Sequence, residues 1–206
     1  MPTDIEIVLY EGFDELDAIG PFEVFCAAAD YGADFSTRLV TLETTESVTA
    51  SHGLRVEPDG VLADAADADL PDLLVIPGGG WNNRSEAGAW AEAQKGAVPA
   101  AAAAYHDAGV TVASVCTGGM LLAESGLTDG RQATTHDGAL ADLRASGADV
   151  VDARVVDDGD ILTAGGVTSG LDLALYVVER EASAEVAEQV SKELEYERRY
   201  DVVRSG

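Results

Sequence analysis

The segment Val110–Ala123 constrains the fold of this chain more than any other stretch, because it predicts a strand that turns sharply into a helix. The run from Val110 to Val115 is apolar and rich in β-branched residues, which is typical of a buried strand. Cys116, Thr117 and two glycines follow, and Met120–Glu124 then has the composition of a helix. Strands that lead directly into helices are the units of α/β folds.

The same alternation of strand and helix runs along the chain. We expect strands at residues 4–10, 35–43, 73–77, 110–115 and 132–135, and a hairpin over 154–163. We expect a loop at 11–17 and helices at 20–31, 85–106 (kinked or broken at Pro99), 117–125, 138–146, 171–178 and 184–200. This pattern predicts an α/β fold with a mostly parallel sheet covered on both faces. Without a linker or a shift in composition, we expect one domain over residues 1–206.

Composition excludes several classes of protein. The chain is 47% hydrophobic without an apolar run long enough to span a membrane, and its start lacks the pattern of a signal peptide, so we expect a cytoplasmic protein. Two cysteines make a disulfide framework improbable. The net charge of −26 is dispersed along the chain, which favours a halophilic protein that stays soluble in high salt. Its 12 scattered cations form no basic face for nucleic acid.

Cys116 is the candidate nucleophile. It lies at the predicted strand-to-helix turn, with the small residues Ser114 and Gly118 two positions away on either side, as in the nucleophile elbow of hydrolases. The helix N-terminus just beyond it favours negative charge and therefore a thiolate. The alternative is a buried cysteine with a packing role.

Two further residues carry possible chemistry. Asp17 is set among apolar neighbours, so burial and a nearby thiolate would keep its carboxyl group protonated and able to act as a general acid. A loop or N-cap aspartate is the alternative interpretation. His136 is a base, a substrate contact or a core histidine, and the sequence leaves these open.

The backbone amides of Gly78, Gly79 and Thr117 are candidates for an oxyanion hole. Gly79, like Asp17, Cys116 and His136, follows a predicted strand, so these groups are expected to meet at the carboxyl edge of the sheet. A metal site is not expected, because neither C-x-x-C nor H-E-x-x-H occurs.

Five motifs together resemble one family. Leu16-Asp-Ala-Ile-Gly-Pro21, Leu74-Val-Ile-Pro-Gly-Gly79, Ser114-Val-Cys-Thr-Gly118, Ala133-Thr-Thr-His136 and Gly165-Gly-Val-Thr-Ser-Gly170 are similar in order and spacing to the ThiJ/PfpI superfamily. The resemblance covers about residues 4–180. It implies a flavodoxin-like three-layer sandwich, related to class I glutamine amidotransferases, with a cysteine nucleophile elbow, no cofactor, a small-molecule substrate and a homodimer.

The isonitrile hydratase subgroup is the most similar, through Leu-Asp-x-x-Gly-Pro and Cys-Thr-Gly. The resemblance implies Cys116 as nucleophile, Asp17 as acid and base, and Thr117 as a third catalytic residue. Gly78, Gly79, Gly118 and His136 are then expected to bind the substrate. Two alternatives are a glyoxalase or deglycase acting on 2-oxoaldehydes, whose family members usually have glutamate in place of Asp17, and a non-catalytic small-molecule or redox sensor. Thr117 stands where the PfpI-type proteases have histidine, which argues against a peptidase.

Overall fold

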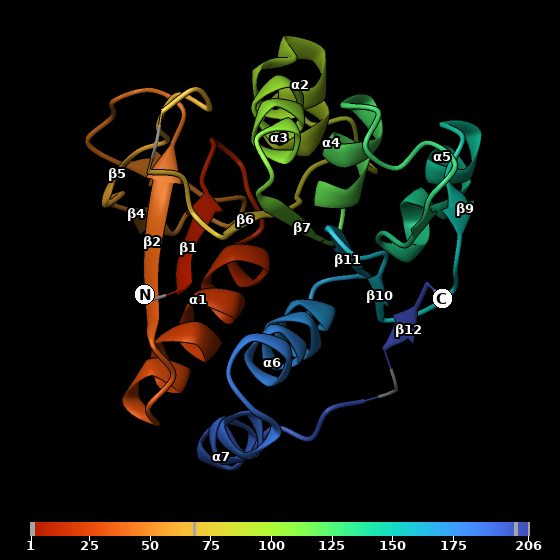
Figure 1. Cartoon of the computed structure of the whole chain (residues 1–206). Coiled ribbons are helices and arrows are strands. Elements are labelled where there is room, and N and C mark those ends of the chain that lie inside the picture. The colour runs from red at the N-terminus through yellow and green to blue at the C-terminus, as the bar shows by residue number, and fades with distance from the viewer. Residues whose placement is uncertain (1–2, 68, 200–201, 206) are drawn as a thin grey trace.

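An eight-stranded sheet forms the middle layer of the molecule in a computed structural model that describes residues 3–67, 69–199 and 202–205 (Figure 1). Its strand order is β12-β10-β11-β7-β6-β1-β2-β5. All neighbours run parallel except β10 and β11, which form an antiparallel hairpin. The strands are β1 (Thr3–Val8), β2 (Phe35–Thr41), β5 (Gly60–Val61), β6 (Leu73–Ile76), β7 (Thr111–Val115), β10 (Val155–Asp157), β11 (Ile161–Ala164) and β12 (Val203–Arg204).

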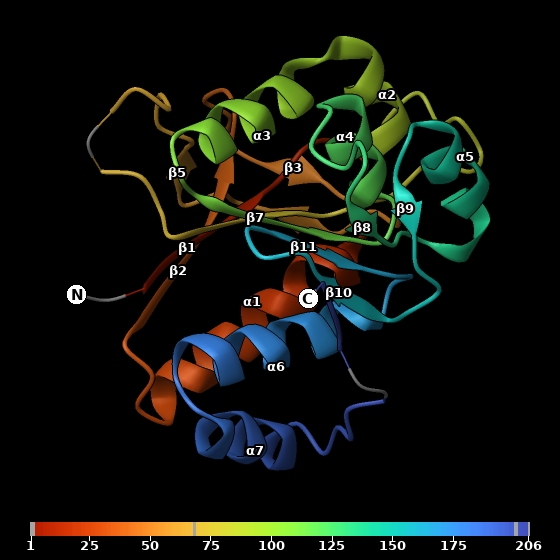
Figure 2. The same ribbon diagram turned by 45° about the vertical axis from the view of Figure 1, so that its right-hand side comes forward.

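Helices cover both faces of this sheet, as Figure 2 shows. Helices α2, α3 and α4 lie on one face, and α1, α6 and α7 lie on the other. The helices are α1 (Glu15–Asp30), α2 (Ala89–Lys95), α3 (Ala97–Asp107), α4 (Gly118–Glu124), α5 (Leu140–Ala145), α6 (Ser169–Glu181) and α7 (Ala184–Glu193). The predicted α/β class and mostly parallel sheet are therefore confirmed, as is the hairpin over residues 154–163.

The centre of the sheet is dry because its strands are apolar on both faces. All four residues of β6 and the last four of β7 are buried. Strands buried on both sides are expected where helices pack on both faces of a parallel sheet. These two central strands end side by side, and the loops that follow them form one rim of the molecule.

The sequence placed the start of the first helix wrongly. Helix α1 begins at Glu15 rather than at Gly20, because the side chain of Asp14 caps it by accepting a hydrogen bond from the backbone N–H of Leu16 at 3.3 Å. Pro21 lies inside the helix and not at its start. Asp17 therefore occupies the first helical turn, where its position is fixed, and not a loop.

Other expected elements also differ in their bounds or their pairing. The helical stretch over residues 85–106 is divided at Gly96, which has a left-handed φ of 77°, while Pro99 lies in the first turn of α3, where proline is tolerated. Strand β8 (Gln132–Ala133) pairs with β9 (Asp149–Val150) in a small separate sheet, as β3 (Val48–Thr49) does with β4 (Arg55–Val56). Helix α7 ends at Glu193, and Tyr200, its expected end, lies outside the described residues.

Candidate active site

Cys116 lies at a sharp turn between β7 and α4. Its φ of 57° is in the left-handed region, which costs a non-glycine residue on the order of 1 kcal/mol or more. Its backbone N–H donates to the carbonyls of Ala164 (3.1 Å) and Gly165 (3.0 Å), which ties the turn to the end of β11. Gly118 is required here, since a Cβ atom at this position would overlap the carbonyl oxygen of Ile76. The predicted elbow geometry is therefore present, and Cys116 is 5% exposed.

Asp17 is fully buried and faces this cysteine. Its Oδ2 accepts a hydrogen bond from the backbone N–H of Gly78 at 3.0 Å, whereas Oδ1 is buried and has no hydrogen-bond partner among the described residues. Burial, and then the negative charge of Asp14, raise the pKa of Asp17 well above its usual value. The carboxyl group of Asp17 therefore favours its protonated form, which could act as a general acid.

The same surroundings act on the thiol. Burial, followed by the charge of Asp17, raises the pKa of Cys116 to about 12, although hydrogen bonds from the backbone of Val167 and Thr117 oppose this rise. Burial and the neighbouring carboxyl group thus oppose the thiolate that the helix N-terminus was expected to favour. Both groups therefore favour their protonated forms, and a thiolate forms only when the thiol gives up its proton.

Thr117 joins the glycine loop to the elbow. Its Oγ1 accepts a hydrogen bond from the backbone N–H of Gly79 at 2.8 Å. The amides of Gly78 and Gly79, which the sequence suggested for an oxyanion hole, are therefore already bonded to Asp17 and Thr117. The backbone amides of Thr117 and Val167 are instead the groups that favour the thiolate form of Cys116.

His136 lies beside the elbow although β8 is outside the central sheet. The preceding residue, Thr135, donates from its Oγ1 to the carbonyl of Cys116 at 2.8 Å. The ring lies against Gly166, because a Cβ atom there would be 2.8 Å from Cδ2 of His136. The side chain is half-buried and lines a hollow with Gly165, Gly166 and other residues. Cys116, Asp17, Thr117, Gly78, Gly79 and His136 thus gather at the carboxyl edge of the sheet.

A sequence model of the DJ-1/PfpI family matches residues 3–180. The chain belongs to the DJ-1/PfpI family. It is 32% identical over 200 residues to the isonitrile hydratase of Pseudomonas putida, an alignment that covers 95% of this chain and 79% of that protein. It is 30% identical over 162 residues to a deglycase of Thermococcus kodakarensis, covering 75% of this chain and 84% of that protein.

A crystal structure of a ThiJ/PfpI family protein from Pseudomonas syringae has the same architecture. Its TM-score to this chain is 0.81 at 27% identity, and the superposition covers 97% of this chain and 77% of that one. The flavodoxin-like DJ-1/PfpI fold is thereby confirmed. None of the helices in the described part of this DJ-1/PfpI chain combines the length and apolarity of a membrane span.

Sequence reasoning missed two residues of this DJ-1/PfpI site. Tyr10, two residues beyond the end of β1, donates a hydrogen bond from its buried hydroxyl to the carbonyl of Pro77 and so holds the glycine loop. A tyrosine ending an apolar strand was the available signal. Val167 favours the thiolate of Cys116 through its backbone N–H. Because nearly every residue has this group, the sequence carries no signal for it.

Among the described residues, one group of possible metal ligands gathers within 4.8 Å: Asp14, Glu15 and His52. Glu15 already accepts hydrogen bonds from the backbone N–H (2.7 Å) and the ring (2.8 Å) of His52. Although partial burial opposes ionisation, these bonds lower the pKa of Glu15 to about 2. Glu15 and His52 therefore form an ion pair at the start of α1.

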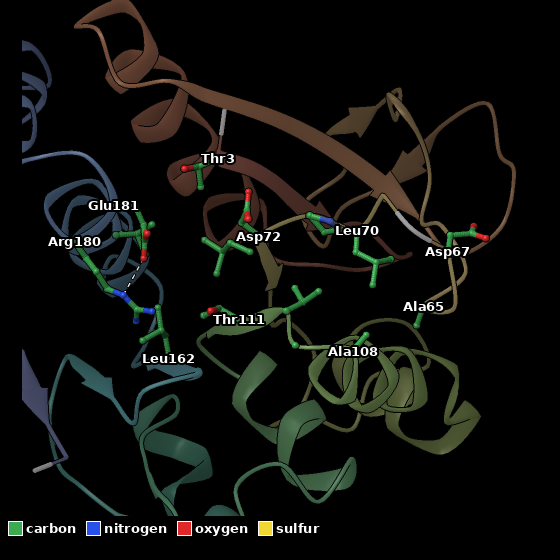
Figure 3. A pocket seen from close by; sticks show the side chains of 15 residues that line it. Thr3, Ala65, Asp67, Leu70, Asp72, Ala108, Thr111, Leu162, Arg180 and Glu181 are labelled. Carbon is green, nitrogen blue, oxygen red and sulfur yellow. Dashed lines mark ion pairs between the residues drawn. The ribbon is translucent and has the colours of Figure 1, made fainter. Parts of the chain in front are cut away.

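A second hollow lies at the opposite edge of the sheet (Figure 3). It is bordered by the first residues of β1, β6 and β7, which are Thr3, Leu73 and Thr111. Arg180 and Glu181 pair with each other on its wall, with 2.9 Å between Nε and Oε1. Because parallel strands carry their carboxyl ends to the other edge, this hollow is separate from Cys116.

Proposed function

We propose that this protein is a cysteine-dependent hydratase that converts an isonitrile to an N-substituted formamide. The observation that carries this proposal is the burial of the Asp17 carboxyl group beside Cys116 at a strained turn. Hydration of an isonitrile needs a nucleophile and an acid at the same carbon, and this pair supplies both. The similarity to the Pseudomonas putida isonitrile hydratase supports the same reaction.

The reaction begins with the proton on Asp17 and the sulfur as thiolate. The sulfur bonds to the terminal carbon of R–N≡C while Asp17 gives its proton to that carbon, which leaves a thioimidate, R–N=CH–S–Cys116. A water molecule then adds its oxygen to this carbon and a proton to the nitrogen. The carbon–sulfur bond breaks as the C=O bond forms, and the remaining proton returns to Asp17. The sum is R–NC + H₂O → R–NH–CHO.

The other residues of the site have supporting roles in this reaction. Thr117 and Val167 donate backbone hydrogen bonds that favour the thiolate, and Gly78 holds Asp17 against it. Gly79 and Gly118 let the backbone approach closely at the turn. We assign His136, which lines a hollow with Gly165 and Gly166, to the part of the substrate away from the reacting carbon.

Formamide production from a simple alkyl isonitrile, followed by proton NMR in high salt, tests the proposal. We expect Cys116→Ser and Asp17→Asn to lower kcat/KM by a factor on the order of 10²–10⁴, the range for loss of a general acid. Cys26→Ser is the matched control, since Cys26 lies on α1 away from the elbow, and it should keep full activity. Full activity in Cys116→Ser would exclude the mechanism.

A second candidate is the conversion of 2-oxoaldehydes, which the similarity to the Thermococcus kodakarensis deglycase favours. The same protein incubated with methylglyoxal would then form lactate without a cofactor. Lactate formation in the absence of isonitrile turnover would replace the hydratase proposal by this one. An absence of turnover with both substrates, together with ready alkylation of Cys116, would favour a sensor.

A further inference from the structure

One ring nitrogen of His136 is held by two hydrogen-bond donors. The backbone N–H of Gly138 lies 3.0 Å from Nδ1, and Nδ2 of Asn82 lies 3.2 Å from the same atom. A backbone N–H can only donate, so Nδ1 must be the acceptor. The proton of the neutral ring is therefore on Nε2.

This assignment also fixes the orientation of Asn82. Because Nδ1 accepts, the side chain of Asn82 presents its NH₂ group and not its oxygen. The close approach depends on Gly138, since a Cβ atom there would lie 2.8 Å from Nδ2 of Asn82. Asn82 belongs to the loop that follows β6, whereas His136 belongs to the loop that follows β8, so the contact joins two loops around the elbow.

The opposite side of the ring lies against Gly166, in the turn that also accepts a hydrogen bond from the backbone N–H of Cys116 through the carbonyl of Gly165. Within residues 3–67, 69–199 and 202–205, no protein atom accepts a hydrogen bond from Nε2 of His136. A Cβ atom on Gly166 would lie 3.4 Å from Nε2, and the hydrogen bond from the backbone N–H of Cys116 to the preceding residue, Gly165, is 3.0 Å long. The ring lines a hollow of about 620 Å³ whose wall includes Thr135, Gly165 and Gly166. Nε2–H is thus an unused donor beside the elbow.

We propose that Asn82 is a positioning residue that fixes His136 as the Nε2–H tautomer, and that this N–H binds an acceptor oxygen on the non-reacting part of the substrate. This inference rests on the proposed hydratase function and specifies the class of isonitrile that the protein would prefer. The preferred substrates are isonitriles that carry a carbonyl oxygen near the isocyano group, such as esters or amides of isocyanoacetic acid.

The tautomer is tested without any turnover, by NMR of protein labelled with ¹⁵N in its histidine rings. His52→Gln and His106→Gln assign the three rings. We expect Nδ1 of His136 to be unprotonated in the wild-type protein and the tautomer ratio to shift about threefold to tenfold in Asn82→Ala, the worth of one hydrogen bond. Gly138→Ala, which displaces the Asn82 amide, should act in the same direction.

Asn83→Ala is the matched control, because Asn83 is an exposed neighbour of Asn82. A proton on Nδ1 in the wild-type protein would overturn the proposal. An Asn82→Ala spectrum identical to that of Asn83→Ala would also overturn it.

The acceptor site is tested by substrate pairs. With an isocyanoacetamide and an alkyl isonitrile of similar size, we expect Asn82→Ala and His136→Asn to raise KM at least threefold more for the amide than for the alkyl compound. His136→Gln, whose amide N–H can occupy the position of Nε2–H, should restore most of the difference. Equal effects on the two substrates would contradict the proposal.

Titration with N-butylformamide provides a probe that needs no turnover. We expect its carbonyl to shift the Nε2 resonance of His136, and an unchanged resonance at saturating probe would overturn the acceptor site. If the wild-type protein converts neither isonitrile, the hydratase function fails, while the tautomer and the titration still decide the roles of Asn82 and His136.

Discussion

At the scale of single residues, the proposed reaction depends on proton transfer between Asp17 and Cys116. The negative charge of Asp17 contributes to raising the pKa of the thiol, after burial. Asp17→Asn removes that charge and keeps the shape of the side chain. We therefore predict that the pKa of Cys116 falls in this variant, so that alkylation by iodoacetamide begins at a lower pH, while hydration is lost because no acid remains.

The rate of alkylation against pH, measured by mass spectrometry in a Cys26→Ser background, checks this prediction. The background is needed because Cys26 is partly exposed and burial also raises its pKa. An alkylation profile that moves to higher pH in Asp17→Asn would mean that the carboxyl group chiefly stabilises the thiolate. The coupled description of the pair would then be wrong.

The side chains to which we assign the proposed chemistry are ones that the sequence singled out. Cys116 and Asp17 stand out because a cysteine after a buried strand and an acid among apolar neighbours are unusual. Val167 acts through its backbone, and the Gly78 and Gly79 amides have acceptors that come from α1 and the elbow. Such partners depend on how distant segments meet, which local pattern does not encode.

At the scale of elements, the sheet and most helices follow from periodicity, whereas boundaries depend on individual contacts. Helix α1 starts at Glu15 because Asp14 caps it, and the cap outweighs the proline inside the helix. Strand β8 has a strand pattern, yet pairing with β9 takes it out of the main sheet. Which strand a short segment pairs with is a tertiary property.

An ion pair between α6 and the start of β10 anchors the segment that follows α7. Arg154 binds the buried carboxylate of Asp172 through Nε (2.7 Å) and Nη2 (2.6 Å). The same carboxylate accepts hydrogen bonds from the Tyr196 hydroxyl and the Arg199 backbone. Asp172 thus links α6, the start of β10 and the segment that follows α7 through hydrogen bonds and an ion pair.

We predict that Arg154→Met destabilises the protein by about 3–5 kcal/mol, because it leaves a buried carboxylate without its cation. Urea unfolding followed by circular dichroism measures the change. Lys192→Met is the matched control, since its ion pair with Glu188 is exposed, and the loss should stay below about 1 kcal/mol. Equal losses in the two variants would show that the buried pair adds nothing special to the fold.

At the scale of the whole molecule, the charge of −26 sets the conditions under which the fold is stable. Acidic side chains on every surface repel one another, and this repulsion is greater in the compact state than in the unfolded chain. Salt shortens the screening length from about 10 Å at 0.1 M to about 3 Å at 1 M, which removes most of the repulsion between neighbouring charges.

We predict that Tm rises on the order of 5–10 °C between 0.1 M and 2 M KCl, given that each kcal/mol shifts Tm by about 2–4 °C in a domain of this size. Differential scanning calorimetry measures it. The triple variant Glu23→Gln, Glu57→Gln, Glu86→Gln changes three exposed acids and brings the charge from −26 to −23, so it should be more stable in low salt and less dependent on KCl. If Tm is independent of KCl, or if the triple variant depends on KCl as strongly as the wild type, self-repulsion does not limit stability, and the acidic surface is not an adaptation to salt.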